Sequence, residues 1–139
     1  MKEDNIFQLI RVMEQFNDKS IIQFTKTFEK DIGIAQILVL NMLAENDALK
    51  QTDISEKLGY SKGGVSHIVN KLIEKKYAER TYNKKDRRVI LLKITSSGKE
   101  ILQQAEQTGQ TLRKNFLSVL NEEEVKQLKH ITQKMLNAF

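Results

Sequence analysis

Apolar residues recur every three or four positions through most of this chain, which is the spacing of one face of a helix. The first such run covers residues 5–29. The second, residues 34–45, is apolar on almost every side, a pattern typical of a buried helix. Gly33 interrupts the pattern between them. The first third of the chain is therefore predicted to form two helices.

Two shorter helices are expected next, joined by a tight turn. Residues 51–58 form the first, and Gly59 stands where a helix commonly ends in a left-handed residue. Ser61 then takes the place of an N-cap before a further periodic run, residues 61–75. The apolar positions of that run are Val65, Ile68, Val69, Leu72 and Ile73. Two short helices joined by a short, glycine-containing turn are typical of a helix-turn-helix.

A β-hairpin follows the helix-turn-helix. Residues 77–82 and 88–95 are rich in β-prone side chains and enclose the polar sequence "NKKD". The connecting loop is longer than a two-residue turn. A helix-turn-helix followed directly by such a hairpin is a winged helix, in which the hairpin is the wing.

Two more helices are expected after the wing. One covers about residues 95–120, and the other begins after Asn121, which has a glutamate three positions later as in a capping box. The helices at the two ends carry more apolar side chains than one small module can cover. Residues 5–30 and 96–139 are therefore interpreted as dimerisation helices. The alternative is that they pack on each other within one chain.

The predicted fold class is thus mainly α with a small β-hairpin wing. One domain, residues 1–139, would contain a winged helix-turn-helix at about residues 34–95, flanked by the N- and C-terminal dimerisation helices. The 139 residues are 40% hydrophobic, which is enough for the core of one domain.

Composition excludes several classes of function. The chain has no cysteine, so it has no disulfide, thiolate zinc site or cysteine nucleophile. His67 and His130 are too far apart in sequence to suggest a metal site. We find no nucleophile–base pair and no phosphate-binding loop, so we expect neither an enzyme nor a cofactor. No signal peptide or membrane-spanning segment is recognisable, which favours a cytoplasmic protein.

Positive charge is concentrated in one part of the chain. The net charge is +5 (23 cations minus 18 acids). Residues 60–93 hold ten of the cations and three of the acids, so this stretch carries +7 and the remainder −2. A basic block suggests a polyanionic partner such as DNA, although a solvated basic surface is the alternative. The tip of a projecting hairpin cannot be buried, and four cations surround Asp86 there: Lys84, Lys85, Arg87 and Arg88.

The helix predicted at residues 61–75 would act as a recognition helix in the major groove. Its inward apolar face leaves Lys62, Gly63, Ser66, His67, Asn70 and Lys71 on the outer side. Residues near the start of such a helix reach base edges. Asn70 can pair bidentately with adenine, and Lys62 can reach guanine or a phosphate.

Gly63 and Gly64 are unusual, because each costs a helix about 1 kcal/mol relative to alanine. They either allow the backbone to approach DNA closely or form a loose first turn without contacts. At the wing tip, Asp86 can hold the Arg88 guanidinium in one orientation, suited to a narrow minor groove. Lys84 and Lys85 need only meet phosphates.

Residues 49–102 resemble the winged-helix core of the MarR family of bacterial transcription regulators. The most specific segments are "LGYSKGGVSHIVNKL" and the wing "DRRVILLKIT" followed by "SSGKE". The resemblance implies a two-fold dimer, a recognition helix at residues 61–75 and a wing at residues 83–88. The Asp-x-Arg of the family's wing tip falls on Asp86 and Arg88.

The resemblance also implies which recognition-helix positions contact bases and phosphates. They are Ser61, Lys62, Gly63, Gly64, Ser66, His67 and Asn70. Together with Lys84, Lys85, Asp86, Arg87 and Arg88 of the wing, these are the candidate DNA-binding residues. Some positions depart from the family's pattern: Gly63 and Gly64 replace a pair of hydroxyl residues, and Lys76 replaces a glycine after the recognition helix.

The expected function is a sequence-specific transcription regulator, a repressor that binds an inverted-repeat operator as a homodimer. Members of the family often respond to a small ligand bound between the dimer helices and the winged helix, so release by such an effector is expected, but no residue identifies the ligand. The alternative is a winged helix that contacts another protein without specific DNA binding, against which the basic wing argues.

Overall fold

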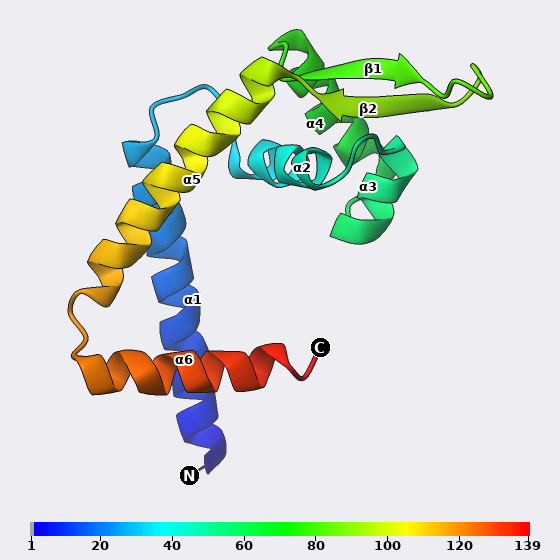
Figure 1. Cartoon of the computed structure of the whole chain (residues 1–139). Coiled ribbons are helices and arrows are strands. Elements are labelled where there is room, and N and C mark those ends of the chain that lie inside the picture. Colours follow the sequence, from blue (N-terminus) through cyan, green and yellow to red (C-terminus); the bar gives the residue numbers. More distant parts are fainter. Residues whose placement is uncertain (1) are drawn as a thin grey trace. The chain divides into compact units, whose positions relative to one another are not determined.

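The computed structural model describes residues 2–139, which form helices and one hairpin (Figure 1). This architecture confirms the predicted fold class. The elements are α1 (Lys2–Thr27), α2 (Ile34–Glu45), α3 (Gln51–Leu58), α4 (Lys62–Glu74), β1 (Ala78–Tyr82), β2 (Ile90–Ile94), α5 (Ser96–Leu117) and α6 (Glu122–Leu136).

The chain divides into two compact units. We call Phe28–Glu106 the winged-helix unit, because it contains α2, α3, α4 and the hairpin. We call α1 together with residues 107–139 the terminal-helix unit. Helix α5 contributes its first half to the winged-helix unit and its second half to the terminal-helix unit.

The core of the winged-helix unit is built where the apolar periodicity placed it. Val65, Val69 and Leu72 of α4 are almost completely buried, as is Ile54 of α3. Helix α2 contributes its own buried residues but is not buried on every side, because Leu38 is 42% exposed. The prediction of an all-round buried helix was therefore wrong for that position.

The hairpin is antiparallel and its register pairs Ala78 with Ile94 and Tyr82 with Ile90. Because side chains alternate between the two faces of a strand, Ala78, Leu92 and Ile94 share the face that is buried. On the other edge of β2, Leu49 and Leu92 exchange two backbone hydrogen bonds of 3.1 and 2.7 Å. Strand β2 is therefore held on both sides.

Two helix ends that the sequence predicted are confirmed. Gly59 ends α3 in a left-handed conformation with φ 68°. Asn121 and Glu124 form the complete capping box at the start of α6, with hydrogen bonds of 2.9 and 3.0 Å. Lys76, where the resemblance implied a glycine, adopts φ 65° and so takes the left-handed conformation without being glycine.

Some boundaries differ from the prediction. Helix α1 begins three residues earlier than expected and ends two residues earlier, and α5 ends at Leu117 instead of about residue 120. Strand β2 begins at Ile90 instead of residue 88, because Asp86 binds the next residues into a turn. The Asp86 carbonyl accepts a hydrogen bond from Val89 N at 3.1 Å.

The terminal-helix unit leaves its apolar side chains open. Helices α1 and α6, both described in full, contain no buried residue. Phe16 of α1 packs edge-to-face on Phe116 of α5, with ring centroids 5.4 Å apart, yet Phe16 remains 56% exposed. None of the helices within residues 2–139 is long and apolar enough to cross a membrane.

Candidate nucleic-acid interface

The start of α4 presents most of the predicted recognition residues to solvent. Ser61 caps the helix, because its Oγ accepts a hydrogen bond from Gly64 N at 3.0 Å. Lys62, His67 and Asn70 are exposed, together with both glycines. Ser66 differs from the prediction, since it lies half-buried beside the inner face of the helix.

Neither glycine of this first turn adopts a left-handed backbone conformation. A Cβ atom added to Gly63 would meet no atom within 4 Å, and one added to Gly64 would meet only Ser61 Oγ, at 3.1 Å. The fold itself therefore gives no steric reason for Gly63. Both interpretations of this turn therefore stay predictions: close approach of DNA, or a loose first turn without contacts.

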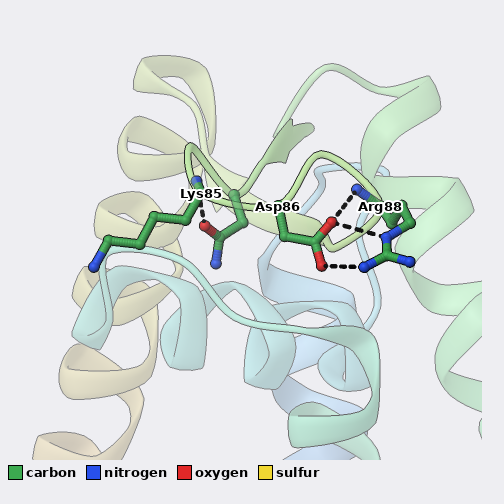
Figure 2. Close-up of polar contacts among 4 residues, drawn as sticks. Lys85, Asp86 and Arg88 are labelled. Atoms are coloured by element: carbon green, nitrogen blue, oxygen red, sulfur yellow. Dashed lines mark hydrogen bonds and ion pairs between the residues drawn. The ribbon is translucent and has the colours of Figure 1, made fainter.

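The wing loop, residues 83–89, is ordered by Asp86. Both carboxylate oxygens of Asp86 accept hydrogen bonds from the Arg88 guanidinium, from Nε at 3.1 Å and from Nη2 at 3.2 Å, as Figure 2 shows. Asp86 Oδ1 also accepts from the Arg88 backbone N at 3.1 Å. The Arg88 side chain nevertheless stays 91% exposed. An acid beside an arginine thus holds the guanidinium in one orientation without covering it, as the sequence predicted.

The contacts with Arg88 also lower the pKa of Asp86. Its hydrogen bonds with the Arg88 side chain, and then with the Arg88 backbone, hold the pKa of the Asp86 carboxyl below its usual value of 3.8. Each of these bonds favours the charged carboxylate. The negative charge of Asp86 is therefore present at neutral pH, and the Asp86–Arg88 contact stays intact.

The other cations of the wing loop project into solvent. Lys84, Lys85 and Arg87 are all exposed, and the loop between β1 and β2 extends past α3 and α4 (Figure 1). Asn83 organises its first half by accepting a hydrogen bond from Lys85 N at 2.9 Å (Figure 2). Asn83 N in turn donates to Val89 O at 3.1 Å. The cations are thus displayed by an ordered loop.

Two other cations of the basic block have partners that the sequence did not reveal. Lys75 donates to the Asp31 backbone carbonyl and to Gln36 Oε1 at 3.4 Å, and forms an ion pair with the Asp31 carboxylate. It therefore anchors the end of α4. Arg80 of β1 donates from Nη2 to Asn70 Oδ1 at 2.9 Å and so links the wing to the recognition helix. Sequence reasoning counted Arg80 only as one of ten cations.

Within residues 2–139, no group of three or more histidine, cysteine or acidic side chains could hold a metal ion. The winged-helix unit instead displays hydrogen-bond donors on the start of α4 and on the wing loop, which is the chemistry that phosphates and base edges accept.

Comparison with known proteins identifies similar chains. A model of the MarR family matches residues 30–89. The HTH-type transcriptional repressor MdtR of Bacillus subtilis is 35% identical over 104 residues, which are 75% of this chain and 67% of that protein.

Two solved structures resemble the whole chain. The first is the YusO protein of Bacillus subtilis, with a TM-score of 0.79 and 28% identity over 98% of this chain and 95% of that one. The second is a point mutant of MarR from E. coli complexed with operator DNA. It has a TM-score of 0.76 and 27% identity, over 95% of this chain and 96% of that one.

Proposed function

This chain belongs to the MarR family of transcriptional regulators, and on that premise we propose that it is a sequence-specific repressor that binds double-stranded operator DNA. The observation that carries the proposal is the joint display of α4 and the wing by one unit. The start of α4 is capped and exposed, and the Arg88 guanidinium is held by Asp86 yet 91% exposed.

In this proposal α4 enters the major groove and the wing loop meets the adjacent minor groove. The contacts come from the two sets of residues inferred from the sequence: Ser61, Lys62, Gly63, Gly64, Ser66, His67 and Asn70 on α4, and Lys84, Lys85, Asp86, Arg87 and Arg88 on the wing. The similar protein that was solved with operator DNA supports the proposal that this chain binds an operator. Asp86 acts through Arg88, because a carboxylate itself would be repelled by phosphate.

The proposed active form is a homodimer. Residues 1–139 would work as one domain, with the winged helix at about 34–95 and dimerisation helices at about 5–30 and 96–139. Support comes from α1 and α6, whose apolar side chains stay largely exposed among the described residues. A second copy would bury these side chains. Such burial stabilises a dimer by about 25 cal/mol for each Å² of apolar surface removed from water.

A small effector is part of the proposal. A ligand that binds one dimer geometry better than another shifts the population of the DNA-binding form, and it can do so only through that difference in affinity. The chain has no cysteine, so thiol oxidation cannot be its signal.

Selection of bound sequences from random duplex DNA tests the proposal. Two recognition helices in a two-fold dimer reach successive major grooves about 34 Å apart, so the selected motif should be an inverted repeat with half-site centres about 10 base pairs apart. Binding should weaken steeply with salt, because phosphate contacts release counterions. An asymmetric motif, or no motif, would contradict the proposal.

One observation favours a second function, contact with another protein. Tyr82 and Ile90 face each other across the hairpin and are 60% and 49% exposed, so the wing carries an apolar pair beside its cations. The same selection experiment separates the two functions. A protein-binding wing without DNA specificity would return no enriched motif, and its residual DNA binding would be independent of sequence.

A further inference from the structure

The contact between Arg80 and Asn70 has a consequence for which base the recognition helix reads. The Arg80 guanidinium donates from Nη2 to Asn70 Oδ1 at 2.9 Å, and both residues are exposed. Arg80 reaches α4 because of the hairpin register. It pairs with Leu92, whose side chain is buried, so Arg80 lies on the face of the hairpin that packs inward. From that face its guanidinium meets Asn70 of α4.

The hydrogen bond orients the Asn70 amide. Its oxygen is turned toward a cation, so its Nδ2 group, which can only donate, points elsewhere. Bidentate pairing with adenine needs both ends of the amide: Oδ1 must accept from the adenine amino group while Nδ2 donates to N7. Oδ1 has two lone pairs, and the Arg80 guanidinium occupies one of them. Its positive charge, 2.9 Å from Oδ1, repels the partly positive amino hydrogen that adenine would bring to the other. The remaining face of the pair presents donors, which match the two acceptors, O6 and N7, of guanine.

We propose that Arg80 is a specificity-determining positioning residue, which holds Asn70 as a hydrogen-bond donor and so directs it to guanine and away from adenine. This inference rests on the proposed function, because it names a base within the operator. It also replaces the expectation from the sequence that Asn70 pairs bidentately with adenine. Arg80 acts through Asn70 here and does not itself need to touch DNA.

Selection from random duplex DNA, repeated with variants, tests this role. The wild-type chain, Arg80→Lys and Asn70→Ala are compared at one salt concentration. Arg80→Lys keeps the charge but loses the planar guanidinium. We expect Asn70→Ala to relax one position of each half-site, a guanine in the wild-type motif. We expect Arg80→Lys to relax the same position by about tenfold or more, the size of a lost base contact, and to leave the other positions and the salt dependence unchanged.

Two controls separate positioning from other roles. Arg87→Lys makes the same change at an exposed arginine of the wing loop that is itself a proposed DNA contact. It should lower the affinity for all sequences alike and leave the base preference at the Asn70-dependent position unchanged. In the Asn70→Ala background, Arg80→Lys should add no further effect, because a positioning residue has nothing left to position. A merely structural Arg80 would instead lower the melting temperature and weaken all DNA sequences alike.

Each possible outcome decides the matter. The inference is wrong if the Asn70-dependent base is adenine, or if Arg80→Lys leaves the motif unchanged. It is also wrong if Arg80→Lys has a further effect in the Asn70→Ala background, since Arg80 would then act on DNA without Asn70. If the wild-type chain selects no motif at all, the proposed function fails, and the inference fails with it. A motif that does not respond to Arg80 overturns the inference alone.

Discussion

The two units of this chain treat their apolar side chains in opposite ways. In the winged-helix unit, apolar residues from Phe28 to Ala105 enclose a core, and Val39, Leu40 and Val65 are completely buried. In the described part of the terminal-helix unit, Leu112 alone among the apolar side chains is buried. Helices α1 and α6 are amphipathic like α4, yet their apolar faces stay largely exposed.

This difference shows that the same sequence pattern has two structural meanings. The apolar stripe of α4 is covered by α2, α3 and the hairpin. The opposite, polar face of α4 is left free to contact a polar partner. The apolar stripe of α6 is not covered by other described residues. Its members Leu128, Ile131 and Met135 are each between 43% and 52% exposed. Exposed apolar patches larger than a few hundred Å² mark interaction surfaces. The winged-helix unit is thus expected to be self-sufficient, and the terminal-helix unit to depend on a second copy.

The largest expected effect follows from placing a charge on the exposed apolar face of α6. In Ile131→Lys the ammonium would be buried without a partner in the dimer, at a cost of about 3 kcal/mol. We expect the chain to sediment as a monomer at concentrations where the wild type is a dimer. Gln133→Lys, which places the same charge on the opposite side of α6, should remain dimeric. If Ile131→Lys remained a dimer, the apolar face of α6 would not be the surface through which the terminal-helix unit depends on a second copy.

The self-sufficiency of the winged-helix unit is tested at Gly98, near the start of α5. A Cβ added there would overlap the Tyr77 carbonyl oxygen and lie 2.7 Å from Ile94 Cγ1. Tyr77 O cannot simply move away, because it accepts a hydrogen bond from Thr95 N at 3.1 Å. We expect Gly98→Ala to reduce the free energy of unfolding by about 2 kcal/mol. Thermal denaturation measures the loss, and it should also appear when the substitution is made in monomeric Ile131→Lys.

DNA recognition should depend on the outer surface of the winged-helix unit, which the wing arginines test directly. Arg88→Ala should weaken operator binding by about 1–3 kcal/mol, because it removes a guanidinium that Asp86 has already oriented. Arg87→Ala removes an equal charge from the adjacent exposed position and should cost less, mainly by flattening the salt dependence. Titrations at several salt concentrations measure both. Equal losses for the two arginines would remove any special role for the Asp86–Arg88 contact.

The sequence was sufficient to predict most of the fold and one of the two side-chain contacts that the wing arginines make. Helix periodicity and capping residues are local signals, so Gly59, Ser61 and Asn121 were placed correctly. The Asp86–Arg88 pair was also predictable, because its partners are two residues apart. The Arg80–Asn70 bond was not, since it depends on how the register of the hairpin places β1 against α4. The contacts of Lys75 were not predicted either, because its partner Asp31 is 44 residues away in the sequence.

A smaller effect is expected at Gly63, where stability and binding should change in opposite directions. An added Cβ meets no atom of the chain, so Gly63→Ala should stabilise the first turn of α4 by about 0.5–1 kcal/mol. If this turn lies against DNA, the methyl group instead keeps the backbone from its partner and weakens binding. Denaturation and operator titration of the same variant give both numbers. Unchanged affinity with raised stability would indicate a loose turn that touches nothing.

The smallest expected effect concerns pH and the order of the wing loop. The Arg88 guanidinium and backbone hold the pKa of Asp86 below 3.8, its usual value and the one expected in the unfolded chain. A group whose pKa is lowered by folding contributes stability above its unfolded pKa, and that contribution is lost as the pH falls through the folded pKa. Between about pH 8 and pH 5, Asp86 therefore stays charged and its contact with Arg88 should not change.

The ¹⁵N and ¹H signals of Arg88 Nε and of its backbone amide report on this contact in the free chain. We expect both to stay constant from about pH 8 to pH 5 and to move only below 3.8, with the midpoint at the lowered pKa of Asp86. Asp86→Asn removes the titrating group, so in that variant the same signals should not respond to acid. A midpoint above 3.8 would mean that Arg88 does not stabilise the charged carboxylate. The wing would then lack the pre-ordered arginine that sets it apart from the exposed helices of the terminal-helix unit.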